Sequence, residues 1–241
     1  MKILITGVSK GLGYHLAKEL LNKHHEVIGI SRSQITESKN LQMLQSHSKF
    51  TYCQTDLFDR KALQNRIMEL ISSGIIPDMV ILNAASMDND CKDNFNFEQF
   101  SKIIEINLLS SLSIVELLLP VFEKRDKGVF VAISSLSAIS AFSRSRVGVG
   151  YPASKSALSM AFESLRLYCS SSNIRFIAIQ PGMLSYKNTL LSTSYDRAAN
   201  KILAHIFKNN SNNVFSFPFI HVVIMLMTKI VPHTILKKFI S

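Results

Sequence analysis

Two side chains that could move a proton stand four residues apart in the segment Tyr151-Pro152-Ala153-Ser154-Lys155. On a helix, this spacing places both on one face, within reach of one another. A free tyrosine has a pKa of about 10 and is a weak acid at neutral pH. Because a neighbouring ammonium stabilises the phenolate, we expect Lys155 to lower the pKa of Tyr151 toward the range useful for general acid catalysis.

A glycine-rich turn lies much earlier in the chain, in the segment from Thr6 to Gly13. It follows the apolar residues 3–5, which predict a buried strand, and it opens a helical pattern. A strand, a glycine turn and a helix are the context of a dinucleotide site, because the bare backbone and the helix N-terminus can approach a pyrophosphate. The alternative is a tight turn before a core helix. The spacing Gly-x-x-x-Gly-x-Gly differs from the longer fingerprint Gly-x-Gly-x-x-Gly.

Further motifs occur between and after these two, and their order resembles the short-chain dehydrogenase/reductase family. The matching positions are Thr6-Gly7-x-x-x-Gly11-x-Gly13, Leu82-Asn83-Ala84-Ala85, Asn107, Ser134-Ser135, Tyr151-x-x-x-Lys155 and Pro181-Gly182. The resemblance implies a nicotinamide cofactor and an active site of Ser, Tyr and Lys, assisted by Asn. Two positions depart from the family pattern. Ala85 stands where Gly is usual, and Met183-Leu184 stands where a Thr that contacts the cofactor is common.

The resemblance gives each catalytic residue a role. Tyr151 would donate a proton to a substrate carbonyl, and Lys155 would lower its pKa and hold the nicotinamide ribose. Ser135 would hydrogen-bond the carbonyl oxygen and stabilise the charge that develops there. Asn107 would support a water molecule that restores the proton. Ser134 is the neighbouring alternative to Ser135.

The residues that follow the second expected strand bear on the choice of cofactor. An acid at this point would hydrogen-bond a ribose 2′-hydroxyl and favour NAD, whereas an arginine accommodates a 2′-phosphate. This chain has Ser31-Arg32-Ser33 with no acid, and Lys10 adds a cation in the glycine turn. We therefore expect NADP(H) in preference to NAD(H), with Arg32 on the phosphate and the two serines as hydroxyl donors. The alternative is an Arg32 that is merely exposed.

The remaining cofactor contacts come from the resemblance. Asp56 and Leu57 resemble the pair that contacts adenine, although Asp56 could instead cap the helix that begins near Asp59. The three cysteines and seven histidines show no metal-ligand spacing, so no metal site is expected. The expected cofactor-binding residues are Gly7, Ser9, Lys10, Gly11, Leu12, Gly13, Ser31, Arg32, Ser33, Asp56, Leu57, Asn83, Ala84, Ala85, Tyr151, Lys155, Pro181, Gly182, Met183 and Leu184.

Apolar segments with strand character alternate with helical patterns, which is typical of a parallel sheet. The expected strands are 2–6, 26–30, 49–53, 79–82, 128–133, 174–179 and 213–216, and the clearest helical patterns are 11–23, 59–72, 97–123 and 151–170. We predict an α/β fold with a single Rossmann-type, doubly wound parallel sheet of about seven strands and helices on both faces. Pro120 should kink or end its helix.

We expect one domain over residues 1–241, with the cofactor and catalytic motifs in 1–184. Residues 185–241 would supply a substrate loop and an apolar C-terminal segment. The apolar run 214–227 is interrupted by Pro218 and is shorter than the roughly 20 residues of a spanning helix. The segment 217–240 has a basic amphipathic end that suits a membrane interface. The alternatives are packing on the core and a homo-oligomer interface.

The net charge of +10 is compatible with an anionic lipid surface or an anionic substrate, for which Arg144 and Arg146 are candidate contacts. Nucleic-acid binding is not expected, because the basic residues are dispersed. The sparse cysteines fit a reducing compartment, and the first expected strand leaves no room for a signal peptide. We expect a cytoplasmic protein, peripheral at most on the inner face of the membrane, that forms a homodimer or homotetramer.

The leading hypothesis is an NADPH-dependent carbonyl reductase that acts on a small-molecule ketone, either lipid-like or sugar-linked. One alternative is an NAD-dependent alcohol dehydrogenase, which an acid near Ser31 would have favoured. The other is a non-catalytic nucleotide-sensing protein on the same fold, which the loss of Tyr151 or Lys155 would have indicated. Both of these residues are present.

Overall fold

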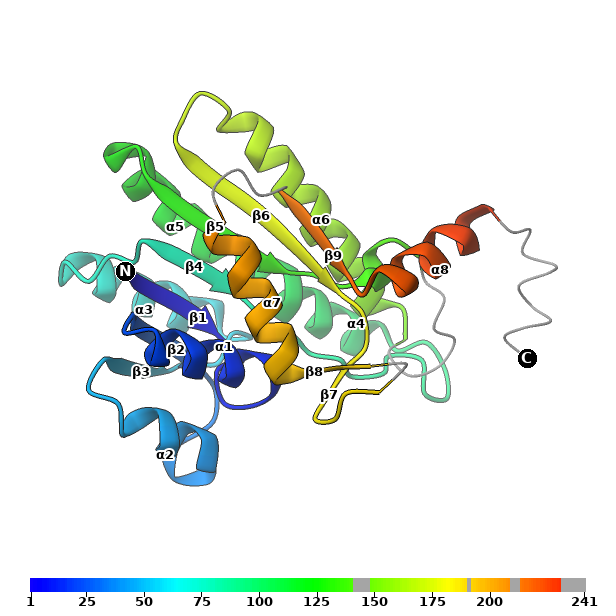
Figure 1. The fold of residues 1–241 in the computed structure, drawn as a ribbon, viewed down its shortest axis with the longest axis horizontal. Helices are drawn as coiled ribbons and strands as arrows, with labels where there is room; N and C mark the ends of the chain where they lie inside the picture. The colour runs from blue at the N-terminus through cyan, green and yellow to red at the C-terminus, as the bar shows by residue number, and fades with distance from the viewer. Residues whose placement is uncertain (141–147, 190–191, 209–212, 231–241) are drawn as a thin grey trace.

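A seven-stranded parallel sheet organises the computed structural model, which describes residues 1–140, 148–189, 192–208 and 213–230 (Figure 1). The strand order is β3-β2-β1-β4-β5-β6-β9. The bounds are β1 (Lys2–Thr6), β2 (Glu26–Ser31), β3 (Phe50–Gln54), β4 (Met79–Leu82), β5 (Gly128–Ile133), β6 (Ile174–Pro181) and β9 (Val214–Phe217). The predicted Rossmann-type α/β fold is confirmed, and each expected strand lies within two residues of its observed bounds.

The sheet reverses its direction of growth beside β1. The chain first moves outward from β1 to β3 and then returns to the other side of β1 with β4. Leu4 of β1 therefore lies opposite both Ile28 of β2 and Val80 of β4. Ligands of such sheets bind at the carboxyl ends of the strands where this reversal occurs. The loops after β1 and β4 thus flank the expected cofactor position.

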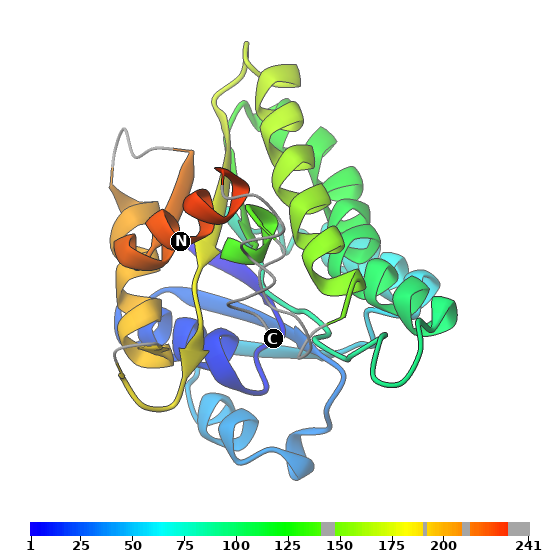
Figure 2. The same ribbon diagram turned by 90° about the vertical axis from the view of Figure 1, so that its right-hand side faces the viewer.

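Helices cover both faces of the sheet because successive strand side chains point to opposite faces. Ile3 and Ile5 belong to the core of one face, which α1, α2 and α7 cover, whereas Leu4 belongs to the core that α3, α5 and α6 cover (Figure 2). The bounds are α1 (Gly11–Asn22), α2 (Lys39–Gln45), α3 (Arg60–Ser72), α4 (Phe97–Ile104), α5 (Ser110–Arg125), α6 (Gly150–Tyr168) and α7 (Tyr195–Phe207).

The helix expected over 97–123 is modified in its middle rather than ended. A π-helical turn, Glu105–Leu109, joins α4 to α5, and Pro120 lies inside α5. Leu118 and Phe122, on either side of the proline, are buried, and this burial offsets the backbone hydrogen bond that proline removes. Of the two expected effects of Pro120, an end to the helix is therefore wrong, and a kink stays a prediction. The stretch Phe97–Arg125 is long enough to cross a membrane and contains an 18-residue window with a mean hydropathy of 1.7, yet its buried side chains form part of the core.

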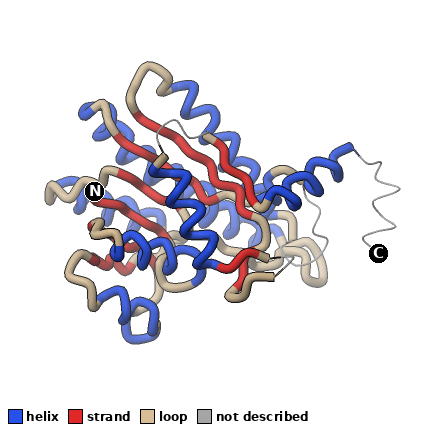
Figure 3. The backbone as a smooth tube through the Cα atoms, in the orientation of Figure 1, coloured by secondary structure: helices blue, strands red, loops and turns tan. Residues whose placement is uncertain are grey.

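Besides α7, three elements of the described chain that follow β6 lie outside the ranges expected from the sequence. A separate pair of short strands, β7 (Leu184–Ser185) and β8 (Thr193–Ser194), lies beyond the carboxyl edge of the main sheet (Figure 3). The last element is α8 (Phe219–Ile230), which projects from the same edge (Figure 1).

Candidate active site

Tyr151 and Lys155 lie in the first turns of α6, and both are buried against the end of β5. The Lys155 ammonium donates a hydrogen bond to the Ile133 carbonyl at 2.7 Å. It lies 5.8 Å from the centroid of the Tyr151 ring. The Tyr151 hydroxyl shares a side-chain hydrogen bond with Ser135. Three of the four expected catalytic residues are therefore brought together.

The surroundings of Tyr151 raise its pKa, whereas the sequence led us to expect a lowered pKa. Burial raises the pKa of Tyr151, and the hydrogen bond with Ser135 lowers it by less. Burial also lowers the pKa of Lys155 from 10.5 to about 8. The ammonium lies over the tyrosine ring and bonds a backbone carbonyl, so desolvation of both groups outweighs their attraction.

The two adjacent serines of the expected motif face different surroundings. The Ser135 hydroxyl bonds the Ser137 hydroxyl at 2.6 Å and also Tyr151. The Ser134 hydroxyl instead donates to the Lys155 carbonyl at 2.9 Å and lies 2.7 Å from the Ser159 hydroxyl. Of the pair, Ser135 is the one beside the tyrosine hydroxyl. Ser137 was not expected, because its approach depends on the 3₁₀ turn at Leu136–Ala138.

Asn107 lies at the centre of the π-helical turn and is fully buried. Its Oδ1 accepts from the Ser86 N–H at 2.7 Å, and its Nδ2 donates to the Ser86 carbonyl at 2.9 Å and to Ser154 Oγ at 3.0 Å. Ser154 Oγ in turn donates to the Tyr151 carbonyl at 2.7 Å. The Asn107 amide thus connects the loop after β4 to the start of α6. Its role in holding a water molecule stays a prediction.

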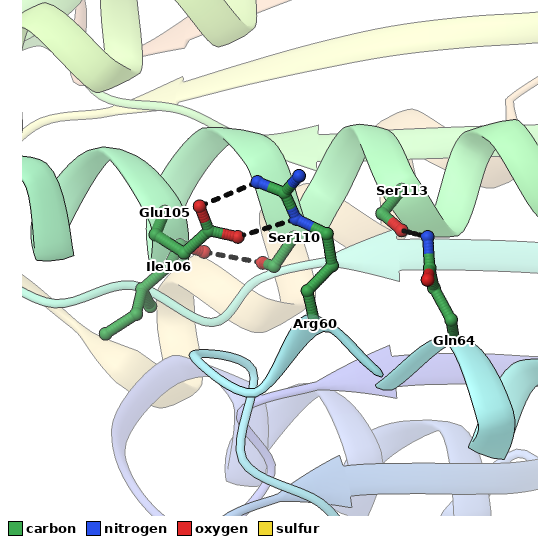
Figure 4. Close-up of polar contacts among 6 residues, drawn as sticks. All are labelled: Arg60, Gln64, Glu105, Ile106, Ser110 and Ser113. Atoms are coloured by element: carbon green, nitrogen blue, oxygen red, sulfur yellow. Dashed lines mark hydrogen bonds and ion pairs between the residues drawn. The ribbon is translucent and has the colours of Figure 1, made fainter. Parts of the chain in front are cut away.

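The π-helical turn is braced from outside by α3 (Figure 4). Arg60 makes two hydrogen bonds to the Glu105 carboxylate, at 2.9 and 2.7 Å. The Ser110 hydroxyl donates to the Ile106 carbonyl at 2.6 Å and supplies a partner to a carbonyl within the altered helix. Such turns often occur at functional sites. Here the turn carries the one asparagine expected in catalysis.

Asp90 is a functional residue that the sequence reasoning missed. Its carboxylate is completely buried and accepts from the Val149 N–H at 2.7 Å and the Gly150 N–H at 2.9 Å. These N–H groups open α6, so Asp90 caps the helix that carries Tyr151. A Cβ on Gly148 would lie 1.6 Å from Asp90 Oδ1, and its φ of +59° also favours glycine. The glycines before Tyr151 were the signal that a buried group approaches the backbone there.

The glycine turn after β1 is held closed by the loop after β4. Asn83 Nδ2 donates to the Thr6 carbonyl at 3.0 Å and the Gly7 carbonyl at 3.3 Å, and Thr6 Oγ1 accepts from the Ala84 N–H at 3.0 Å. A Cβ at Gly13 would lie 2.1 Å from the Gly7 carbonyl oxygen, so no other residue fits there. Ala85, in contrast, is exposed, and the Ala that replaces the usual Gly meets no obstacle.

The N-terminus of α1 presents backbone donors to this turn. Lys10, at the N-cap, is extended and makes no capping hydrogen bond through its side chain. The Ser9 carbonyl is held by Ser38 at 3.1 Å and Asn40 at 3.2 Å, which fixes the turn from the side of α2. Leu12 is buried and offers only its backbone. Free N–H groups at a helix start bind anions, so this end suits a pyrophosphate.

The residues after β2 are only partly arranged as expected. Arg32 is exposed and lines a cavity of about 540 Å³, together with Gln54, Thr55, Asp56, Asp59, Ala62 and Arg66. Ser31 is buried, and its hydroxyl lies 2.8 Å from that of Tyr52 on β3. Its expected role as a hydroxyl donor to the cofactor stays a prediction.

The start of α3 answers whether Asp56 caps that helix. The N-cap of this helix is Asp59, which accepts from the Ala62 N–H at 3.0 Å. Asp56 accepts only from the Phe58 N–H at 3.0 Å, and it lines the cavity beside Arg32. Leu57 is buried in the core, so any contact with adenine would come from its backbone.

The segment after β6 packs against the start of α8. The Gly182 N–H donates to the Phe217 carbonyl at 2.7 Å, and a Cβ at Gly182 would lie 2.7 Å from His221 Nδ1. Pro181 ends β6, Leu184 begins β7, and the Met183 side chain is exposed. The candidate substrate contacts Arg144 and Arg146 lie outside the described residues.

Comparisons with known proteins give the chain its relatives. A family model described as short chain dehydrogenase matches residues 1–195. The NADPH-dependent pterin aldehyde reductase of Arabidopsis thaliana is 27% identical over 196 residues, which cover 80% of this chain and 77% of the relative. A short-chain dehydrogenase from Streptomyces avermitilis has a TM-score of 0.79 at 17% identity, over 95% of this chain and 92% of its own. One from Leptospira borgpetersenii with bound NAD+ has a TM-score of 0.67 at 21% identity, over 78% and 73%. The structural likeness shows the fold.

Replacing Asp90 should loosen the start of α6. In Asp90→Asn, one oxygen acceptor remains, but an NH₂ group replaces the other and faces a backbone N–H. We expect a loss of roughly 2 kcal/mol, because a buried donor is left without a partner. The melting temperature should then fall by about 4–8 °C. Asp93→Asn, at an exposed acid in the same loop, is the control. Equal melting temperatures for the two variants would contradict the capping role.

The buried ammonium should make stability depend on pH. Because the pKa of Lys155 is about 8 when folded and 10.5 ordinarily, the unfolded chain binds more protons between these values. The destabilisation is fully present below pH 8 and is relieved as the pH rises toward 10.5. The melting temperature of the wild type should therefore rise relative to that of Lys155→Met as the pH increases from about 8 to 10.5. A difference that is constant with pH would show that the ammonium is not desolvated.

Proposed function

Because this chain belongs to the short-chain dehydrogenase family, whose members are oxidoreductases that use NAD(P)(H), we propose that it is an NADPH-dependent carbonyl reductase. The observation that carries the proposal is the group of buried Tyr151 and Lys155 with half-buried Ser135 at the carboxyl edge of the sheet. The glycine turn, which suits a pyrophosphate, lies at the same edge. A reductase needs both of these parts in one place.

The side chains divide the work of reduction among them. The nicotinamide, when bound, supplies the hydride. Tyr151 gives its proton to the carbonyl oxygen, and Ser135 donates a hydrogen bond to the same oxygen and stabilises the charge that develops there. The raised pKa of Tyr151 keeps its proton in place until the oxygen becomes basic. Lys155 supplies positive charge beneath the tyrosine ring and a donor for the nicotinamide ribose.

The residues of the glycine turn fit the rest of the dinucleotide. A pyrophosphate would lie against the N–H groups that open α1, where Gly11 and Gly13 leave the backbone bare. The Asn83–Ala85 segment would pass along the adenosine ribose. Asp56 and the backbone of Leu57 would meet the adenine. Pro181, Gly182, Met183 and Leu184 would enclose the nicotinamide end.

The preference for NADP(H) rests on charge. Arg32 and Lys10 are both exposed cations beside the expected adenosine position, and Arg32 borders the cavity after β2. A guanidinium can bind a phosphate through two hydrogen bonds. Ser33, next to Arg32 in the chain, would add a hydroxyl donor to the same phosphate. Relatives of this chain bind either cofactor, so the alternative of an NAD-dependent alcohol dehydrogenase is tested by the same experiment.

For the substrate, we propose a lipid-like or sugar-linked ketone. Met183 and Tyr186, at the mouth of the expected nicotinamide position, expose large apolar side chains. Such groups suit an apolar part of a substrate better than a small polar acid. We further propose that the enzyme acts as a homodimer or homotetramer.

Removing the Tyr151 hydroxyl should greatly reduce turnover without weakening NADPH binding. In Tyr151→Phe, we expect turnover to fall by roughly 10²–10⁴-fold, the usual contribution of a general acid. NADPH affinity, measured by fluorescence titration, should stay close to that of the wild type. Tyr168→Phe, at an exposed tyrosine on the same helix, should be fully active. Near-normal turnover of Tyr151→Phe would reject the mechanism. No turnover by the wild type across a panel of acyl, polyprenyl-linked and sugar ketones, with NADPH still bound, would favour a non-catalytic nucleotide-binding protein.

Reversing the charge at Arg32 should change the cofactor preference. We expect the wild type to bind NADPH at least about tenfold more tightly than NADH, which corresponds to about 1.4 kcal/mol from the phosphate contact. Arg32→Asp should erase or reverse this ratio, whereas Lys39→Asp, at an exposed cation on α2, should keep it. Equal affinities of the wild type for the two cofactors would refute the phosphate site and favour the NAD-dependent alternative.

A further inference from the structure

Helix α8 carries its apolar side chains on the side that faces solvent. At 100° per residue, six of them fall within an arc of about 160°. Their exposed fractions are 81% for Phe219, 58% for Ile220, 37% for Val223, 45% for Ile224, 48% for Leu226 and 52% for Met227. We call these six residues the outer face of α8.

The opposite side of α8 is the more polar one, and it packs on the protein. It contains His221, Val222, Met225 and Thr228, all half-buried. Thr228 Oγ1 donates to Ser140 Oγ at 2.8 Å, and the His221 ring lies close to Gly182. A surface helix of a water-soluble fold turns its apolar side inward. The reversed arrangement indicates that the outer face has a partner other than water.

The position of α8 connects this outer face to the active site. The helix follows β9 at the carboxyl edge of the sheet, and in Figure 2 it lies beside the short turn Leu136–Ala138. That turn follows Ser135 directly and precedes Ser140, to which Thr228 bonds. Whatever the outer face contacts will therefore lie close to the edge of the sheet that carries the candidate active site.

The charge around α8 identifies the kind of partner. The last acid of the sequence is Asp196, and residues 197–241 contain no Asp or Glu. The same stretch contains Arg197, Lys201, Lys208, Lys229, Lys237 and Lys238. The Lys201 ammonium lies 5.8 Å from the centroid of the Phe217 ring, directly before α8. An apolar helix face within an exclusively basic stretch of chain matches a bilayer with anionic headgroups.

We propose that the outer face of α8 docks on the surface of an anionic lipid bilayer. A second copy of the chain fits less well, because a twofold contact through α8 would bring together two copies of residues 197–241, which contain no acid to pair with the cations of the other copy. The docked chain would present the carboxyl edge of the sheet to the lipid. If the proposed reductase activity holds, its ketone would carry an apolar tail that resides in the bilayer.

Vesicle flotation of the full chain tests this docking. The vesicles are phosphatidylcholine alone, or equimolar phosphatidylcholine and phosphatidylglycerol. We expect the chain to float with the anionic vesicles at low salt. Added salt should weaken the binding without abolishing it, because salt screens the lysines but not apolar insertion. Failure to float with anionic vesicles at low ionic strength would overturn the proposal.

Two double variants distinguish lipid binding by the outer face of α8 from non-specific adsorption of exposed apolar side chains. Phe219→Ser combined with Ile224→Ser should lower the vesicle partition coefficient at least about tenfold. Met160→Ser combined with Leu167→Ser, at equally exposed positions on α6, should leave it unchanged. Both double variants should keep the wild-type rate with NADPH and a water-soluble ketone, so loss of docking is distinguishable from loss of the reductase. Equal vesicle binding by the two double variants would overturn the lipid assignment. So would light scattering that shows a dimer for the wild type and the α6 variant but a monomer for the α8 variant.

Discussion

A reciprocal pair of hydrogen bonds between β5 and α6 fixes the catalytic edge of this protein. The Lys155 ammonium donates to the Ile133 carbonyl, and the Lys155 carbonyl accepts from the Ser134 hydroxyl. Desolvation of a charged amine is costly, and here the Ile133 carbonyl oxygen at the end of β5 offsets that cost by accepting a hydrogen bond from the ammonium. Since this pair sets where α6 meets the sheet, it also sets the place of Tyr151. The adjacent Ser135 then reaches the tyrosine hydroxyl without further adjustment.

The other loops of this edge are held by the same kind of interaction, in which a buried polar side chain bonds the backbone of a neighbouring loop. Asn83 ties the loop after β4 to the glycine turn, and Asn107 ties it to α6 through Ser154. Asp90 closes the start of α6. Buried groups of this kind are expensive when one partner is missing, so they specify a single arrangement. The glycine turn, the loop after β4 and the start of α6 are thereby joined to one another.

Much of this could be predicted from the sequence, where the signal is local. The apolar runs predicted every strand of the main sheet, and the motifs placed Tyr151, Lys155 and Ser135 together. What the sequence did not reveal depends on distant contacts. The Ser31 hydroxyl lies beside that of Tyr52 on another strand, and burial rather than Lys155 decides the direction of the shift in the tyrosine pKa. Asp90 lies 60 residues before the helix that it caps, so no spacing rule could pair the two.

The central claim is that the glycine turn and the tyrosine–lysine pair form one dinucleotide site, and a crystal structure of the chain grown with NADPH tests it most directly. The account predicts pyrophosphate density against the N–H groups that open α1, and a nicotinamide ribose within hydrogen-bonding distance of Tyr151 and Lys155. The 2′-phosphate should contact Arg32. A dinucleotide bound with its nicotinamide away from Tyr151, or no binding at saturating NADPH, would contradict the account.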